Sequence, residues 1–177
     1  TMNYRILILL IPIITAYFLG SSSPSIAISR SKGIDIKNEG SKNAGTTNAL
    51  RTLGNGAAAL TLLIDLLKGY ASVVLGLWFF NNFSSFMGLK SSSVVDLYLS
   101  NLIGTIFISL VMLFVFLGHI FPIYYDLKGG KGVATGLGCY LAIDYKLALI
   151  AIAVCIIATL ISRRMSVGSL LDAISIV

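Results

Sequence analysis

The stretch VVDLYLSNLIGTIFISLVMLFVFL, residues 94–117, decides the fold class of this chain. Its side chains are apolar almost throughout. Its length suits a helix that crosses about 30 Å of hydrocarbon, which takes about 20 residues. A second block of the same kind runs from Ala57 to Phe80. Both blocks therefore predict transmembrane helices.

Shorter apolar blocks lie on either side of these two. Ile6–Gly20 precedes them, and Val133–Ile161 follows them with an interruption at Asp144-Tyr145-Lys146. A last block begins at Val167 and runs to the final residue, Val177. The pattern predicts an all-α, polytopic integral membrane helix bundle with five helices plus the start of a sixth, in a single domain over residues 1–177.

The composition supports a membrane protein. Of the 177 residues, 56% are apolar and 11% are charged, and the mean hydropathy is +0.92. These values exclude soluble globular, disordered and disulfide-framework proteins. The net charge of +6 does not indicate nucleic-acid binding, because long apolar blocks separate the charges into short clusters.

Those charge clusters indicate the orientation in the membrane. Lys and Arg gather in the segments 30–51, 128–131 and 163–164, whereas the opposite side carries single charges such as Lys90. Positive residues favour the cytoplasmic side of a membrane. We therefore expect the three rich segments in the cytoplasm and the N-terminus outside.

The cysteine and histidine content gives no sign of a disulfide or a metal centre. Cys139 and Cys155 both lie inside apolar segments, where a free thiol behaves as a small hydrophobic group. The chain has one histidine, which is too few for a zinc site. We expect neither a metal nor a cofactor.

A glycine-rich segment, KGGKGVAT at residues 128–135, begins a short apolar run. A helix from Gly132 to Ile143 would span about 18 Å at 1.5 Å per residue, which is too short for the bilayer. The start of this helix should therefore lie inside the protein, as in a re-entrant helix. Irregular backbone at that depth is tolerated where it lines a polar cavity, so we expect a site there.

The same segment has the composition of a phosphate cradle. Glycines let backbone N–H groups approach an anion, the helix N-terminus adds a positive dipole, and Lys128 and Lys131 add full charges. It is not a Walker A loop, because Lys131 is followed by glycine where Ser or Thr is required. The alternative is a small-residue packing surface with lysines that snorkel to the interface.

The segment 33–54, between the apolar blocks Ile6–Gly20 and Ala57–Phe80, is long and polar. Thr47 or Asn48 is expected to cap a short helix that ends near Gly54. A solvated connector without function is the alternative. Against it stands a dense set of donors suited to an oxyanion, namely Ser41, Asn43, Asn48 and Arg51.

Other polar residues lie in or next to apolar blocks, and each has two interpretations. Asp65 and Lys68 are spaced i, i+3, so they can pair on one helix face, for structure or for function. His119 follows the apolar block 94–117. It is either a hydrogen-bonded anchor or an acid or base. Ser166 and Ser169 either start a helix or contact a substrate.

Taken together, these segments resemble the bacterial acyl-phosphate:glycerol-3-phosphate acyltransferases, the PlsY family of integral membrane enzymes. The first matching motif is GSKNAGTTN at residues 40–48, and the second is GHIFP at 118–122 with KGGKGVAT at 128–135. The match is ordered and covers nearly the whole chain. Shorter matches are Gly20-Ser21 through Pro24, Gly33–Ile36, Arg51, Leu53 and Gly54, Asp65–Gly69 and Arg163–Ser169.

The resemblance implies transfer of a fatty acyl group from acyl phosphate to the 1-hydroxyl of glycerol 3-phosphate. The products are lysophosphatidic acid and phosphate, in the first step of phospholipid biosynthesis. It places the chain in the bacterial inner membrane among membrane lipids, and we expect a monomer. Acyl phosphate is already activated, so neither an enzyme nucleophile nor a metal is obligatory. Holding the hydroxyl against the carbonyl can supply an effective molarity of about 10⁵ M or more.

Residues and resemblance together assign a candidate site. Catalytic roles are expected for Ser41, Arg51 and Lys131. We predict that Lys131 and the N–H groups of Gly129 to Gly132 bind glycerol 3-phosphate. The residues expected to bind substrate are Asn43, Gly45, Thr47, Asn48, His119, Lys128, Gly129, Gly130, Gly132, Thr135, Ser166 and Ser169.

The sequence departs from the family pattern in two places. Lys42 stands where many members have glycine, which adds a positive charge beside Ser41. The family's third cytoplasmic motif, with a histidine, an asparagine and a later glutamate, has no counterpart before Val177. We therefore expect a C-terminally truncated chain that is inactive or nearly so. The other function that these residues allow is a small membrane transporter or channel subunit with an anion or phosphate site.

Overall fold

The computed structural model describes residues 2–83, 86 and 94–162. Within these ranges every regular element is a helix, which confirms the all-α prediction. The helices are α1 (Met2–Gly20), α2 (Pro24–Ser31), α3 (Thr46–Leu53), α4 (Asn55–Phe83), α5 (Val94–Ile120), the 3₁₀ turn η1 (Ile123–Tyr125), α6 (Val133–Ile143) and α7 (Tyr145–Ser162).

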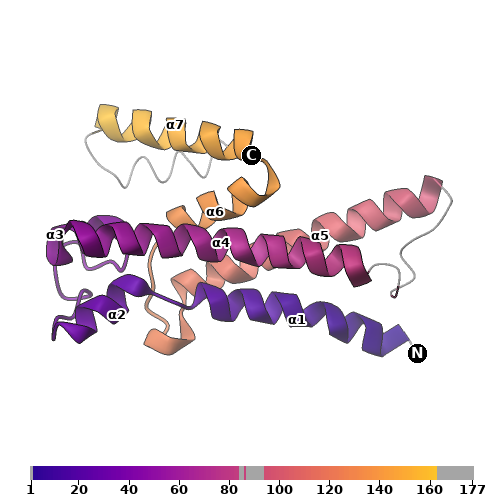
Figure 1. Cartoon of the computed structure of the whole chain (residues 1–177), viewed down its shortest axis with the longest axis horizontal. Helices are drawn as coiled ribbons and strands as arrows, with labels where there is room; N and C mark the ends of the chain where they lie inside the picture. The colour runs from indigo at the N-terminus through magenta and orange to yellow at the C-terminus, as the bar shows by residue number, and fades with distance from the viewer. Residues whose placement is uncertain (1, 84–85, 87–93, 163–177) are drawn as a thin grey trace.

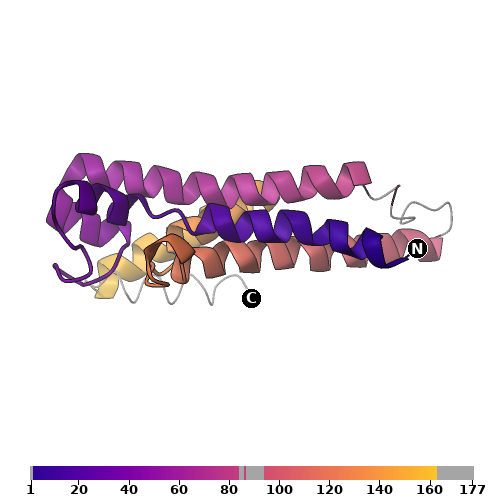
Figure 2. The same ribbon diagram turned by 90° about the horizontal axis from the view of Figure 1, so that it is seen from below.

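Three long helices, α1, α4 and α5, lie side by side and form the body of the molecule (Figures 1 and 2). In the described part of the chain, three helical segments are long and apolar enough to cross a membrane, at Leu7–Ser31, Asn55–Phe83 and Leu99–Tyr125. The short helices α2 and α3 gather at one end of this body (Figure 1). We call that end, with the loops around it, the polar end.

The apolar blocks of the sequence correspond to α1, α4, α5, α6 and α7. As predicted, α6 is short, with 11 residues, and it starts directly after Gly132. Asp144 separates it from α7, which turns back beside it (Figure 1). The block that begins at Val167 lies outside the described residues.

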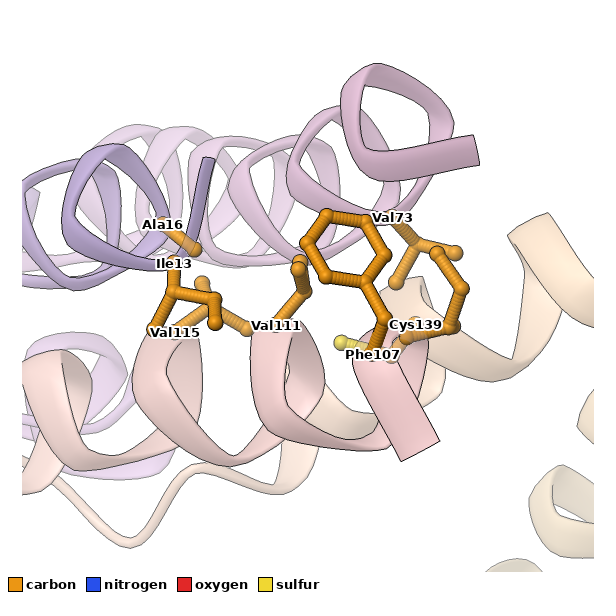
Figure 3. Close-up of a cluster of buried hydrophobic side chains, with 8 residues drawn as sticks. Ile13, Ala16, Val73, Phe107, Val111, Val115 and Cys139 are labelled. Atoms are coloured by element: carbon orange, nitrogen blue, oxygen red, sulfur yellow. The ribbon is translucent and has the colours of Figure 1, made fainter. Parts of the chain in front are cut away.

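The middle of the bundle is packed with apolar side chains from four helices (Figure 3). Glycines let the helices approach closely there and toward the polar end: a Cβ on Gly20 would collide with the carbonyl of Val115, and one on Gly118 with the carbonyl of Tyr17. Small residues at helix contacts are typical of membrane bundles. The buried cluster comprises Ile13, Ala16, Val73, Phe107, Ile108, Val111, Val115 and Cys139.

Close contact between α4 and α6 places the candidate site. A Cβ on Gly69 would collide with the carbonyl of Thr135, and one on Gly138 with the carbonyl of Leu66. The two backbones therefore touch, as small residues in membrane helices allow. This contact brings the start of α6 beside the turn of α4 that carries Asp65 and Lys68.

The polar end has a small core of its own. Ile26 from α2 packs with loop and helix residues that are almost completely buried, Ile36, Ala44 and Ala49, and with Ala58 of α4. Ser25 donates to the carbonyl of Ala44 at 2.5 Å. The segment 33–54 is therefore folded onto the bundle, and the solvated-connector alternative is wrong.

Candidate functional site

A cavity of about 650 Å³ opens at the polar end between the segment 33–54, α4, α6 and α7. One wall is polar and comes from the loop and α3. Another part of the lining comes from the start of α6, with apolar side chains of α4 and α7. The lining residues are Ser41, Asn43, Gly45, Thr46, Thr47, Asn48, Arg51, Leu62, Asp65, His119, Lys131, Gly132, Val133, Ala134, Leu137 and Cys155.

Asn48 organises the loop wall. Its Nδ2 donates to the carbonyls of Ile36 at 3.1 Å and Glu39 at 3.0 Å, and its Oδ1 accepts from the backbone N–H of Ser41 at 2.8 Å. The side chain is 1% exposed. Although Asn48 lines the cavity, its amide is used inside the protein. It therefore fixes the position of Ser41, and the expectation that it binds substrate directly is not supported by its contacts.

The short helix α3 was predicted correctly, but its start was not. The N-cap is Gly45, with extended backbone and no side-chain cap, and neither Thr47 nor Asn48 occupies that position. The helix ends at Leu53 and is followed by Gly54 at the C-cap, which has a φ of +89° that favours glycine. Arg51 lies in the last turn of α3, exposed, and it lines the cavity together with Ser41.

The glycine-rich loop, residues 128–132, is held by the end of α5. Gly129 N–H donates to the carbonyl of Ile120 at 2.8 Å, and Gly130 N–H donates to that of His119 at 3.1 Å. The prediction that these two N–H groups bind glycerol 3-phosphate is therefore wrong, because both are already used within the protein. Gly132, with a φ of +81°, starts α6, and it lines the cavity with Lys131.

Lys37 links the two loops, and sequence reasoning did not single it out. Its Nζ donates to the carbonyl of Gly129 at 2.5 Å, across 92 residues of sequence. Partial burial lowers the pKa of this amine below its usual value, and the nearby Lys128 lowers it further, while Asp35 acts in the opposite direction. The bond fastens the segment 33–54 to the glycine-rich loop.

A buried charged cluster adjoins the cavity, and two of its members, Asp65 and His119, line it. Lys68 Nζ lies 2.8 Å from Asp65 Oδ1, as the i, i+3 spacing predicted, and it also donates to the carbonyl of Ser22 at 2.6 Å. His119 Nδ1 lies 3.1 Å from Thr135 Oγ1 and 3.5 Å from Asp65 Oδ1. All four side chains are buried. His119 is therefore a hydrogen-bonded member of a network that joins α4, α5 and α6.

The other predicted residues divide into three groups. Asn43, Gly45 and Thr47 line the cavity as expected, whereas Lys128, Gly129, Gly130 and Thr135 do not. Lys128 is exposed, and Thr135 is fully buried against His119. Ser166 and Ser169 lie outside the described residues.

Several lining residues escaped the sequence analysis. Asp65 was recognised as one of a pair but not as part of the site. Apolar residues at the cavity, Leu62, Leu137 and Cys155 among them, carry no signal because any transmembrane helix contains such residues. Thr46 lies at the start of α3, and Val133 and Ala134 lie at the start of α6. The folded structure is needed to see that these two helix starts line the same cavity.

Comparison with known proteins gives a consistent result. The sequence model of the family described as glycerol-3-phosphate acyltransferase matches residues 10–177. The glycerol-3-phosphate acyltransferase of Thioalkalivibrio sulfidiphilus (strain HL-EbGR7) is 40% identical over 162 residues, which cover 91% of this chain and 69% of that protein. The protein of the same name from Finegoldia magna (strain ATCC 29328 / DSM 20472 / WAL 2508) is 38% identical over 177 residues, covering 99% and 77%.

Solved structures are similar as well. The crystal structure of PlsY, an integral membrane glycerol 3-phosphate acyltransferase, in its glycerol 3-phosphate form has a TM-score of 0.75 and 32% identity. The match covers 95% of this chain and 74% of that one. The lysophosphatidic acid form of PlsY has a TM-score of 0.72 and 31% identity, with coverage of 95% and 73%.

Proposed function

The chain belongs to the glycerol-3-phosphate acyltransferase family, and from this membership we propose that it transfers a fatty acyl group from acyl phosphate to the 1-hydroxyl of glycerol 3-phosphate. The products are lysophosphatidic acid and inorganic phosphate. The observation that carries the proposal is the cavity at the polar end, where Arg51 from α3 and Lys131 from the glycine-rich loop line the same space. Both substrates carry a phosphate, and two cations from separate segments of the chain suit them.

The two walls suggest a division of roles. Lys131 stands at the start of α6 beside Gly132, where the helix dipole adds to its charge, and it binds the phosphate of glycerol 3-phosphate. Arg51 has a planar fork that fits a phosphate bidentately, and it acts on the acyl phosphate. Ser41, Asn43, Gly45 and Thr47 line the wall beside Arg51 and complete the substrate contacts.

The apolar side of the cavity receives the acyl chain. Leu62 of α4, Leu137 of α6 and Cys155 of α7 line the cavity with apolar side chains. A fatty acyl chain buried there leaves the lipid for another apolar surface, while its phosphate head reaches the cations. This arrangement holds the activated carbonyl at the boundary between the apolar and polar walls.

Catalysis then rests on positioning and electrostatics. The hydroxyl oxygen bonds to the acyl carbonyl carbon, the bond from that carbon to the phosphate oxygen breaks, and the hydroxyl proton passes to the departing phosphate. Bringing the two substrates together in one cavity provides the effective molarity, and donors aimed at the developing oxyanion add about 3 kcal/mol per group. Phosphate is a good leaving group, so the proposal includes no acyl-enzyme on Ser41.

The topology is part of the proposal. The polar end faces the cytoplasm, with the N-terminus of α1 outside, in the bacterial inner membrane. This orientation follows the excess of Lys and Arg in the segments 30–51 and 128–131. The proposal also includes a monomer.

A reconstituted assay tests this function. The full-length enzyme, with the family's third motif present, is purified and placed in liposomes with acyl phosphate and labelled glycerol 3-phosphate. A parallel sample receives the acyl thioester of the same chain length as donor. We expect labelled lysophosphatidic acid with acyl phosphate alone, together with one phosphate per product. Product formation from the thioester would contradict the donor assignment. Uptake of labelled phosphate without acyl transfer would favour the transporter instead.

A further inference from the structure

We infer that Asp65, His119 and Thr135 are positioning residues that hold the glycine-rich loop and the start of α6, and thereby place Lys131 in the cavity. This inference rests on the proposed function, because it gives Lys131 a substrate to bind. Its starting point is the buried cluster that adjoins the cavity. Asp65, Lys68, His119 and Thr135 are between 0% and 6% exposed.

His119 is the centre of the cluster. Its Nδ1 faces Thr135 Oγ1 at 3.1 Å and Asp65 Oδ1 at 3.5 Å. Its Nε2 lies so close to Gly130 that a Cβ there would collide with the ring. Its carbonyl accepts the N–H of Gly130. One residue at the end of α5 therefore contacts α4, α6 and the glycine-rich loop at once.

Stability alone does not explain why charged side chains are buried in this cluster. Removing two ions from water usually costs about as much as their attraction returns, and a buried ion pair is best attested as a device that fixes geometry. Lys68 neutralises Asp65 at 2.8 Å and is anchored to the carbonyl of Ser22. The carboxylate of Asp65 is thus fixed by α4 and by the link between α1 and α2.

The path from the cluster to Lys131 is short. Gly130 is covalently joined to Lys131 and is held by His119 through both ring and carbonyl. On the other side, Thr135 lies in the first turn of α6 and bonds to the same ring. Lys131 therefore lies on the chain between two points that His119 fixes. A shift of the ring moves both points.

Thr135 allows a decisive test because it does not line the cavity. Thr135→Val keeps the shape and removes the hydroxyl that meets His119. Thr61→Val is the matched control, since Thr61 is equally buried but bonds to the carbonyl of Ala57 in its own helix. An effect of Thr135→Val on substrate affinity must be transmitted through the protein, because Thr135 does not line the cavity.

The experiment measures KM and kcat for glycerol 3-phosphate and the Kd for this substrate in purified protein. We expect Asp65→Asn to raise KM and Kd about tenfold and Thr135→Val to raise them about threefold, below the roughly hundredfold that a 1 Å displacement can cost. Thr61→Val leaves both unchanged. A purely structural role would lower the amount of active enzyme, and so kcat, without changing KM.

A second measurement does not depend on the substrate. Hydrogen exchange at residues 128–135 should be faster in Asp65→Asn and Thr135→Val than in the wild type, and unchanged in Thr61→Val. His119→Asn, which keeps an N–H donor near the Nδ1 position, should slow this exchange relative to His119→Gln. Gly130→Ala should accelerate it by displacing the ring, whereas Gly136→Ala should not, because no atom lies near a Cβ there.

The outcomes separate the two claims. Unchanged KM, Kd and exchange in Thr135→Val would overturn the positioning role, even if Asp65→Asn fails to fold. A wild-type chain that binds no glycerol 3-phosphate would contradict the proposed function. In that case, faster exchange in Thr135→Val would still show that the cluster holds the loop.

Discussion

The middle of the bundle and its polar end are held together in different ways. In the middle, α1, α4 and α5 pack Ile13, Val73 and Val111 into one apolar cluster (Figure 3). At the polar end, single side chains such as Asn48, Lys37 and His119 hold loops that are far apart in sequence.

This difference follows from the solvent each region meets. Lipid is as apolar as the helix surfaces, so packing in the middle is driven by close fit rather than by the hydrophobic effect. The polar end contains irregular backbone whose N–H and C=O groups need partners. Substitutions in the middle should therefore change stability alone, and substitutions at the polar end should change substrate affinity or turnover.

Arg51→Lys should have the largest effect on turnover. The charge remains, but the planar fork that fits a phosphate is lost, and we expect activity to fall about a hundredfold. Arg30→Lys is the control, because Arg30 is also an exposed arginine of this end but contacts Asp126 and the ring of Tyr125 outside the cavity. Near-normal turnover of Arg51→Lys would show that Arg51 contributes only to the excess of positive charge on the cytoplasmic side.

Lys131→Ala should chiefly weaken binding of glycerol 3-phosphate. Loss of a charge-assisted contact to phosphate costs roughly 1.5 to 3 kcal/mol, or about 10- to 150-fold in KM. Lys32→Ala removes the same charge from an exposed position outside the cavity, and it should leave KM unchanged. Equal KM values in the two variants would remove Lys131 from the site. Lys128→Ala should resemble Lys32→Ala, because Lys128 does not line the cavity either.

Asn48→Asp should impair both stability and turnover. The carboxylate has the size of the amide but cannot donate to the carbonyls of Ile36 and Glu39, and leaving them unpaired costs about 1 to 3 kcal/mol each. Asn38→Asp is the matched change at an exposed position whose amide bonds to Asp35. Thermal unfolding and kcat measure the two effects. Wild-type values for Asn48→Asp would show that the loop does not depend on this amide.

Val111→Ala should have the smallest effect and should leave the site untouched. The side chain is completely buried, and its loss should lower the free energy of unfolding by roughly 1 to 2 kcal/mol through lost packing. Val74→Ala makes the same change on an exposed face of α4 and should be neutral. A changed KM for glycerol 3-phosphate in Val111→Ala would break the distinction between the two regions.

The middle was easier to predict from sequence than the polar end. Apolar blocks have a period and a length, so α4, α5 and the short α6 could be located from composition alone. Ser41, Arg51 and Lys131, which the sequence singled out, line one cavity, and their catalytic roles stay predictions. The partners of Gly129, Gly130 and Asn48 could not be foreseen. They are carbonyls of other segments, and every residue has a carbonyl, so sequence does not indicate which one will lie nearby.

The central claim is that the cavity between the two loops is the glycerol 3-phosphate site. Its most direct test is protection of single cysteines at Asn43→Cys and Ala134→Cys, one on each wall, in active protein with Cys139 and Cys155 replaced by alanine. We predict that glycerol 3-phosphate slows thiol labelling at both positions, half-maximally near its KM. Glycerol should not slow it, and a cysteine at Lys32 should be unaffected. Unchanged labelling at both walls, with acyl transfer intact, would contradict the claim.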